Sequence, residues 1–217
     1  MRIITGKWRS RKLDAPRSSR TRPMPERVRE AVFDILAARF ELPGMLPPIH
    51  VADLFAGSGS MGFEAVSRGA EMCHFYERGP QATRTIKHNI EQLEAQDCCR
   101  VIRADAWTAC LATPRPQVPY GLVFIDPPYR DARDASANGR VPKLLADLSR
   151  ADWVDAKTIV VVHHEAAVQY NANGAMWWRI ADHRTYGTAG ITLMVSRTSS
   201  PWGSKDRELP PDDSTAV

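Results

Sequence analysis

The sequence predicts an α/β fold with a doubly wound, mostly parallel sheet of seven strands and an antiparallel strand at its C-terminal end. Between residues 50 and 164, short apolar stretches alternate with stretches of helical spacing, which is the pattern of βαβ units. Two more apolar stretches, near 177–186 and 190–196, are joined through Gly187–Gly190. A terminal hairpin of this kind adds the antiparallel strand to an otherwise parallel sheet.

The elements of the alternating part follow from the spacing of apolar residues. We expect strands over 50–56, 72–77, 100–105, 121–126 and 158–164. We expect helices over 60–69, 80–94 and 140–150. The strand at 121–126 is the most strongly apolar of the set, which indicates a central place in the sheet.

The chain ahead of the sheet is organised differently. Residues 1–16 alternate enough to form a short hairpin, with Gly6 near its turn, and a helix is expected from Pro25 to about Phe40. The run PGMLPP at 43–48 then breaks the chain. We therefore divide the sequence into a basic N-terminal hairpin and helix (1–44), the α/β domain (45–197) and a tail expected to be disordered (198–217).

Charge is distributed unevenly along the chain. Residues 1–30 hold ten Lys or Arg and three acids, a net charge of +7, whereas the whole chain carries +4. Such asymmetry favours a polyanionic partner for the N-terminal region. A solvated basic tail without a partner explains the charge equally well.

Composition excludes several classes of protein. The hydrophobic fraction of 43% allows a sizeable core, and no stretch reaches the ~18 apolar residues of a membrane helix. The first residues lack the apolar core of a secretory signal. Four cysteines show neither CxxC spacing nor disulfide-rich density. We therefore expect a cytoplasmic, monomeric protein with reduced thiols and no membrane partner.

A glycine-rich loop joins the first strand of the alternating part to its helix. Gly57, Gly59 and Gly62 satisfy the pattern GxGxxG, and Glu77 follows twenty positions after the first glycine, at the end of the next strand. Such glycines let a nucleoside cofactor approach the backbone, and the acid accepts hydrogen bonds from ribose hydroxyls. The pattern alone does not separate NAD from S-adenosylmethionine.

Acidic residues near this loop favour S-adenosylmethionine. Asp53, just before the glycines, would repel a pyrophosphate but would suit the ammonium of a methionine moiety or a sulfonium. The alternative for Asp53 is a cap on the loop backbone, and for Glu77 it is a solvated strand end. Asp105 could accept a hydrogen bond from an adenine amine or could cap the turn at Ala106 and Trp107.

The tetrapeptide Asp126-Pro127-Pro128-Tyr129 follows the apolar strand at 121–126. Ligands bind at the carboxyl ends of strands in open α/β sheets. The exocyclic amine of a base is a poor nucleophile, and two acceptors on its N–H bonds favour a nitrogen whose lone pair can attack a methyl group. Asp126 offers one acceptor and the Pro127 carbonyl the other, while Tyr129 offers a flat face to a flipped-out base. The alternative is a proline-rich turn capped by Asp126.

These motifs together resemble a known class of enzymes. Residues 53–70, Glu77, Asp105-Ala106 and the 126–129 tetrapeptide are similar to class I methyltransferases that act on exocyclic amines, which have a Rossmann-like fold. The stretches GKWRSRKL (6–13), ERVREAVFDIL (26–36) and TYGTAGITLMV (185–195) narrow the resemblance to the bacterial RsmD family of 16S ribosomal RNA guanine-N2 methyltransferases. The resemblance covers roughly residues 1–197. Met24 and Pro25 depart from it, since the family usually has small hydroxyl residues there.

The resemblance implies a cofactor, a partner and three sets of residues. S-adenosylmethionine would be the cofactor and 16S ribosomal RNA, within a small ribosomal subunit, the partner. The catalytic set would be Asp126, Pro127, Pro128 and Tyr129. The cofactor-binding set would be Asp53, Phe55, Ala56, Gly57, Ser58, Gly59, Glu77, Arg78, Asp105 and Ala106. The RNA-binding set would be Lys7, Trp8, Arg9, Arg11, Lys12, Arg22 and Arg27.

Other functions remain open on the residues alone. The same tetrapeptide would serve methylation of adenine N6 or of a protein glutamine, and a non-catalytic RNA-binding module for ribosome assembly could retain the fold. A nicotinamide oxidoreductase is disfavoured by Asp53. No metal site is expected at His163-His164-Glu165, because consecutive strand residues point to opposite faces. No cysteine follows a proline, which argues against methylation of carbon 5 of a pyrimidine.

Overall fold

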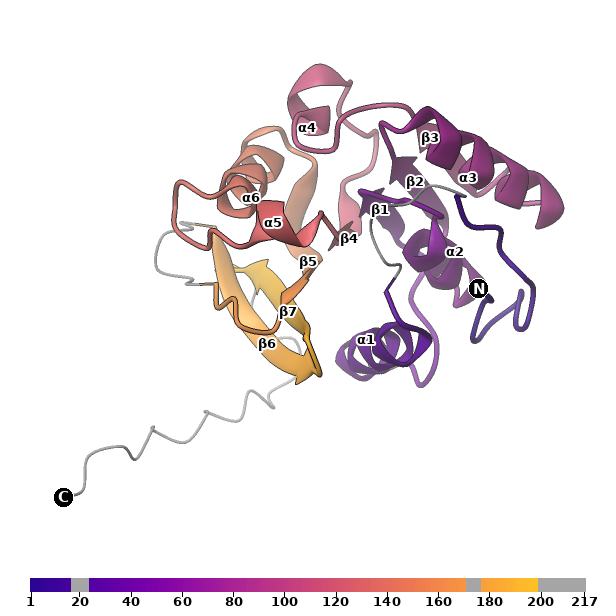
Figure 1. Cartoon of the computed structure of the whole chain (residues 1–217), viewed down its shortest axis with the longest axis horizontal. Helices are drawn as coiled ribbons and strands as arrows, with labels where there is room; N and C mark the ends of the chain where they lie inside the picture. Colours follow the sequence, from indigo (N-terminus) through magenta and orange to yellow (C-terminus); the bar gives the residue numbers. More distant parts are fainter. Residues whose placement is uncertain (17–23, 171–176, 199–217) are drawn as a thin grey trace.

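A computed structural model describes residues 1–16, 24–170 and 177–198. One seven-stranded sheet has the order β3-β2-β1-β4-β5-β7-β6, and β7 runs antiparallel to both of its neighbours while the other pairs are parallel (Figure 1). The strands are β1 (His50–Leu54), β2 (Met72–Tyr76), β3 (Cys99–Ile102), β4 (Tyr120–Ile125), β5 (Val154–Glu165), β6 (Trp178–Tyr186) and β7 (Ala189–Ser196). The predicted fold class is confirmed.

Helices cover both faces of the sheet, with α2 and α3 to its right and α5 and α6 to its left in Figure 1. They are α1 (Glu26–Arg39), α2 (Ser60–Ser67), α3 (Pro80–Gln92), α4 (Ala109–Ala112), α5 (Tyr129–Ala132) and α6 (Arg140–Arg150). The sequence did not predict α4 and α5, because four residues are too few to show a helical period.

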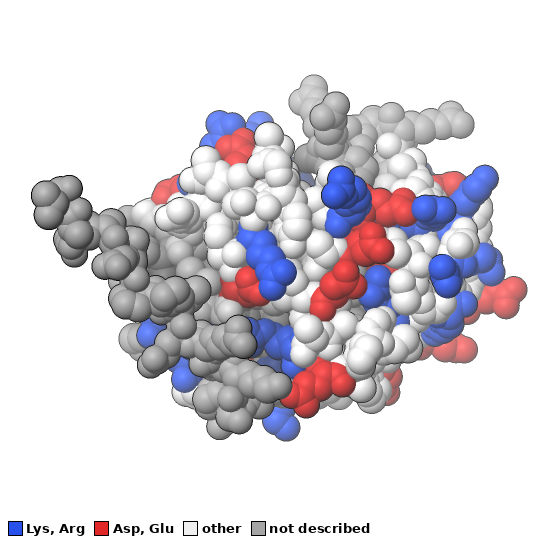
Figure 2. Space-filling model, turned by 90° about the horizontal axis from the view of Figure 1, so that it is seen from below, with Lys and Arg blue, Asp and Glu red and all other residues white. Residues whose placement is uncertain are grey.

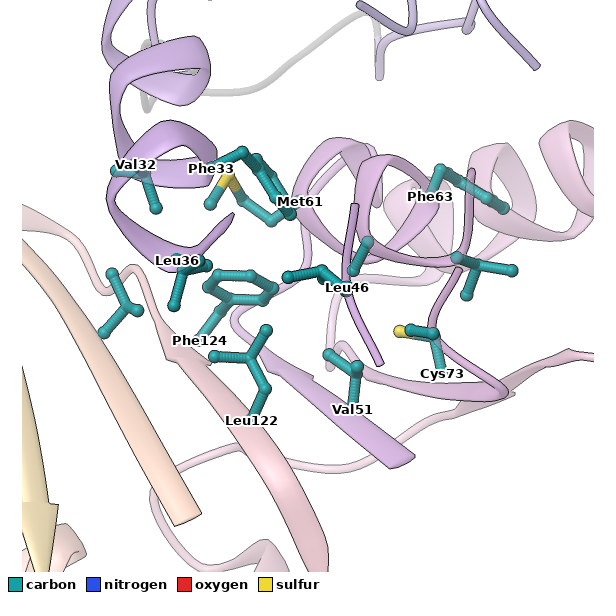
Figure 3. Close-up of a cluster of buried hydrophobic side chains, with 14 of the residues drawn as sticks. Val32, Phe33, Leu36, Leu46, Val51, Met61, Phe63, Cys73, Leu122 and Phe124 are labelled. Atoms are coloured by element: carbon teal, nitrogen blue, oxygen red, sulfur yellow. The ribbon is translucent and has the colours of Figure 1, made fainter. Parts of the chain in front are cut away.

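The strands alternate between two hydrophobic clusters, as the period of two along a strand requires. In β4, Leu122 and Phe124 pack towards α1 and α2, whereas Val123 and Ile125 pack towards α6. Figure 3 shows the first cluster, with Phe33 of α1 above Phe124. Both faces of the central strands are therefore buried, which explains their continuous apolar runs.

The carboxyl ends of four strands lie in one row, and β5 passes through it. Residue pairing across β3, β2, β1, β4 and β5 aligns Ile102, Tyr76, Leu54, Ile125 and Val162, and β5 continues to Glu165. The segments that follow β1, β2, β3 and β4 therefore start at the same edge. Strand order reverses between β1 and β4, and ligands of open α/β sheets bind outside such a switch point.

Residues 1–16, the N-terminal arm, fold back on themselves and lie beside α2 (Figure 1). An antiparallel bridge joins Arg2 and Lys12, and the Ile3 N–H donates to the Arg11 carbonyl at 3.0 Å, so the arm is a short hairpin, as the sequence predicted. Ile3, Trp8 and Leu13 are buried in the same cluster as α1 and α2. The core is therefore continuous across residue 44, where we expected a domain boundary.

A buried carboxylate fixes the arm to the domain. Glu64 of α2 accepts hydrogen bonds from the backbone N–H groups of Ile4 (2.7 Å) and Thr5 (3.0 Å) and from Arg68 (2.8 Å). The guanidinium of Arg29 lies 3.9 Å away, and burial lowers its pKa although Glu64 opposes the shift. Paired in this way, the Glu64 charge can remain in the interior.

Candidate functional site

A cleft of about 160 Å³ opens at the edge where the strands end. Its lining includes Asp126 and Pro128 of the tetrapeptide and six residues of the expected cofactor set, namely Phe55, Gly57, Glu77, Arg78, Asp105 and Ala106. Tyr76, Trp107 and Asp131 line it as well, and the sequence did not single them out. The two motifs predicted from the sequence thus share one cleft.

The three glycines of the loop have different physical roles. Gly57 has φ +58° and open space where a side chain would stand, so its backbone faces the cleft freely. A Cβ on Gly59 (φ +80°) would come within 2.7 Å of the Phe63 ring. A Cβ on Gly62 would lie 2.3 Å from the Phe75 ring. Gly57 therefore lets a ligand in the cleft approach the backbone, and Gly59 and Gly62 allow α2 to pack closely on the sheet.

Glu77 holds the glycine loop from the end of β2. Its two carboxylate oxygens accept hydrogen bonds from the N–H groups of Gly57 (3.0 Å) and Gly79 (2.6 Å). A carboxylate offers about four acceptor positions, so two of them stay available in the cleft. This geometry suits the pair of hydroxyl groups on a ribose.

An aromatic wall closes one side of the cleft. Phe55, which has φ +65°, meets Trp107 edge to face at 4.6 Å between ring centroids. The Arg140 guanidinium lies 4.2 Å from the centre of the Trp107 ring and pairs with Asp131 at 3.2 Å. An L-residue with positive φ carries backbone strain, and such strain gathers at functional sites.

Asp105 caps the turn that follows it, which was one of the two roles that we considered for this residue from the sequence. One of its oxygens accepts from the Trp107 N–H at 3.1 Å, and the other pairs with Arg78 at 3.3 Å. Both side chains are exposed at the mouth of the cleft. A role for Asp105 towards an adenine amine stays a prediction.

Asp53 lies behind the glycine loop rather than on the wall of the cleft. Its carboxylate accepts from the Gly62 N–H at 3.0 Å, which is the backbone cap that the sequence left as its alternative. Burial raises the pKa of this carboxyl well above its usual range, and the charges of Asp126 and Glu77 raise it further. Contact with a cofactor ammonium stays a prediction.

Ala56, Ser58 and Gly59 belong to the glycine loop, and two of them make hydrogen bonds that hold the loop to its neighbours. The Ala56 N–H donates to the Tyr76 carbonyl at 3.2 Å, and the Ser58 carbonyl accepts from the Asn89 amide at 3.2 Å. None of the three is part of the cleft lining. Their expected contact with a cofactor is untested.

The tetrapeptide turns sharply from β4 into α5. Asp126 is partly exposed, Pro127 is buried, and Tyr129 begins the helix. One oxygen of Asp126 lies 2.7 Å from His163 Nδ1, and the Tyr129 hydroxyl lies 3.1 Å from His163 Nε2. Burial raises the pKa of the Tyr129 phenol, and Asp126 and Glu165 contribute to the shift. In the sequence we considered His163 only as a metal ligand; it lies within β5, one residue beyond Val162, which pairs with the last residue of β4.

The basic residues expected to contact RNA divide into three groups. Lys7, Arg9, Arg11, Lys12 and Arg27 are exposed. Trp8 is only 9% exposed and packs in the core, because the arm docks through its apolar side, and its expected contact with RNA stays a prediction. Arg22 lies outside the described residues.

Charge on the visible surface is mixed. Figure 2 shows acidic and basic side chains next to one another on the face that it presents. In the arm, Lys7 lies over the Trp8 ring at 4.5 Å, and Arg11 donates to the Gln92 carbonyl. Arg11 therefore joins the arm to the end of α3, although its side chain is exposed.

Among the residues that the structure describes, no group of three or more His, Cys, Asp or Glu side chains is arranged to hold a metal ion. No helix in the described ranges combines the length and apolar character of a membrane span.

The sequence of this chain is similar to those of known proteins over most of its length. The family described as Conserved hypothetical protein 95 matches residues 1–195. Putative rRNA methyltransferase YlbH of Bacillus subtilis is 30% identical over 91% of this chain and 100% of its own length. Ribosomal RNA small subunit methyltransferase D of Escherichia coli K12 is 31% identical over 76% of this chain and 75% of its own.

Solved structures agree with the sequence matches. The putative methyltransferase yhhF from Escherichia coli superposes with a TM-score of 0.71 at 28% identity, covering 90% of this chain and 97% of that one. The putative methylase HI0767 from Haemophilus influenzae gives a TM-score of 0.66 at 26% identity with the same coverage. The fold of this chain is thus that of class I methyltransferases.

Proposed function

Because this chain belongs to the RsmD family, described as Conserved hypothetical protein 95, we propose that it methylates the N2 amine of a guanine in 16S ribosomal RNA. The methyl donor is S-adenosylmethionine, and the acceptor RNA lies within a small ribosomal subunit in the cytoplasm. The observation that carries the proposal is the single cleft lined by both the glycine loop and the tetrapeptide, at Gly57 and Asp126.

Three features of the cleft support a nucleoside ligand. Glu77 offers acceptors to ribose hydroxyls, Gly57 gives backbone access, and the Phe55–Trp107 pair provides apolar surface for a purine. At about 160 Å³ the cleft is smaller than pockets that enclose a drug-sized ligand. The bound cofactor would therefore remain partly exposed.

When bound, S-adenosylmethionine supplies a methyl group on a positively charged sulfur, open to in-line attack by nitrogen. Asp126 and the Pro127 carbonyl each accept one N–H of the acceptor amine and so direct its lone pair towards that methyl group. Tyr129 faces the base. Once the nitrogen carries the methyl group, it must lose one proton, and the Asp126 carboxylate already accepts that N–H. Catalysis in this scheme is mainly positioning and needs no covalent enzyme intermediate.

The arm provides the affinity for RNA in this proposal. Lys7, Arg9, Arg11 and Lys12 are exposed on a segment that is rigidly docked to α2. Binding through phosphate contacts weakens as salt is added. The logarithm of the binding constant falls with the logarithm of the salt concentration, with a slope of about −0.7 per contact on single strands. Charge reversal at Arg9 and Lys12 should therefore weaken RNA binding and flatten its salt dependence, because the apolar docking residues stay in place.

Parallel acceptor assays test the proposal. Purified protein with methyl-labelled S-adenosylmethionine is offered unmethylated small subunits, naked 16S RNA, DNA and protein. We expect label in the ribosomal RNA, and most of all in the subunits. Label confined to DNA or protein would favour the adenine-N6 or glutamine alternative, and no label in any acceptor would favour the non-catalytic assembly module.

A further inference from the structure

His163 contacts both functional ends of the tetrapeptide. Its Nδ1 lies 2.7 Å from Asp126 Oδ1, and its Nε2 lies 3.1 Å from the Tyr129 hydroxyl. The His163 side chain is 4% exposed and that of Asp126 28%. The imidazole therefore lies inside the protein, and the carboxylate that it contacts reaches the cleft.

The topology of the sheet creates this contact. Ile125 pairs with Val162 across β4 and β5, so Asp126 and His163 follow side by side at the same edge. Tyr129 returns over them as the first residue of α5, with its ring 5.3 Å from the imidazole and nearly perpendicular to it. The end of β4, β5 itself and the start of α5 together therefore fix the position of the His163 side chain.

Hydrogen-bond chemistry defines the proton positions. An ionised carboxylate only accepts, so Nδ1 carries the hydrogen towards Asp126. In the neutral imidazole Nε2 is then an acceptor, and the Tyr129 hydroxyl donates to it. Burial and the neighbouring carboxylates raise the pKa of Tyr129, which keeps the phenol protonated for this donation. In this tautomer both ring nitrogens of His163 have a hydrogen-bond partner.

We propose that His163 is a positioning residue of the methyl transfer, which holds Asp126 Oδ1 and the Tyr129 hydroxyl so that Asp126 Oδ2 is presented to the substrate amine. The inference rests on the function proposed above. It explains how Asp126, which accepts a hydrogen bond from the substrate amine, is oriented. A carboxylate that is free to rotate offers its oxygens in many directions. Fixing one oxygen leaves the other in a single direction, and small misplacements of a reacting group can cost ~10²-fold in rate.

Variants of His163 separate its two contacts. His163→Phe keeps an aromatic ring and removes both hydrogen bonds. His163→Asn keeps a donor at the place of Nδ1 for Asp126, whereas His163→Gln places an amide at the position of Nε2, near Tyr129. By analogy with groups that orient metal ligands, we expect kcat to fall by about 10–100-fold in His163→Phe. We expect His163→Asn to recover most of that loss, with unchanged affinity for S-adenosylmethionine in all three.

A double-mutant cycle tests the second contact. If the Tyr129 hydroxyl acts through His163, Tyr129→Phe lowers kcat in the wild-type background and has no further effect in His163→Phe. His164→Asn is the matched control, since His164 is buried on the same strand but contacts Thr192 and the Glu165 carbonyl. Its kcat should equal that of the wild type below its melting temperature.

Each outcome decides a different question. Wild-type kcat in folded His163→Phe would overturn the inference, as would equal losses in His163→Asn and His163→Phe. A similar loss in His164→Asn would also overturn it, because it would indicate general damage to β5. Absence of methyl transfer by the wild-type chain would instead contradict the proposed function.

Discussion

At the scale of single residues, Asp126 joins the cleft to the interior. One of its oxygens is held by His163, and the residue also lines the cleft. We expect Asp126→Asn to retain binding of S-adenosylmethionine but to lose about 10²–10³-fold in kcat, by analogy with a single lost oxyanion-hole donor. Asp147→Asn on α6 is the control, since this side chain is also half-buried but pairs with Arg150. Turnover close to that of the control would remove Asp126 from its assigned role.

His164 gives the fold a dependence on pH. Burial lowers its pKa to about 4, and its two nitrogens contact the Glu165 carbonyl and the Thr192 hydroxyl. The unfolded chain takes up this proton near pH 6.5, whereas the folded chain resists it until about pH 4. The stabilisation is therefore full above pH 6.5 and is lost as pH falls towards 4, a change on the order of 3 kcal/mol. Urea titrations across this range should show a flatter profile for His164→Gln, and an identical profile would refute the assignment.

At the scale of elements, the sequence predicted the repeating units well because their strands are buried on both faces and read as apolar runs. It also predicted α6 to the residue, since its apolar positions follow a clear helical period. It could not predict α5, where Pro127 and Pro128 suggested only a turn. The resemblance assigned Trp8 to RNA, and its contact with the core is not visible in the sequence because it depends on how the arm docks.

The glycine loop offers a matched pair of variants. Gly57→Ala meets open space but needs an unfavourable φ of +58°, at about 1–2 kcal/mol, and its methyl group would face the cleft. Gly62→Ala would clash with Phe75 and Cys73, at about 1–3 kcal/mol. We expect Gly57→Ala to weaken S-adenosylmethionine binding by about tenfold or more, and Gly62→Ala to lower mainly the melting temperature. Calorimetry that shows equal affinities for the two variants would contradict this division.

The arm should be an integral element rather than a removable appendage. Glu64→Ala removes the acceptor of Ile4 and Thr5 and leaves Arg68 and Arg29 without their buried partner. We expect the free energy of unfolding to fall by about 3–5 kcal/mol in urea titrations. Glu71→Ala, at an exposed position, is the control. A loss below about 1 kcal/mol would show that the arm docks without this carboxylate.

At the scale of the whole molecule, the site exists because β3, β2, β1 and β4 end in one row beside β5. The sequence placed the glycine loop, Glu77 and the tetrapeptide at strand ends, which was enough to predict that they meet. It did not supply the order of the strands, and only the adjacency of β4 and β5 brings His163 to Asp126. The buried position of Asp53 likewise depends on how closely α2 packs on β1 and β2.

The proposal that this protein methylates guanine N2 is decided by the identity of the nucleoside that carries the new methyl group. Small subunits lacking this modification are incubated with the protein and S-adenosylmethionine, the 16S RNA is digested, and its nucleosides are identified by mass spectrometry. We expect N2-methylguanosine at one position, with none formed by Asp126→Asn. N6-methyladenosine, or a product formed equally by Asp126→Asn, would contradict the proposal.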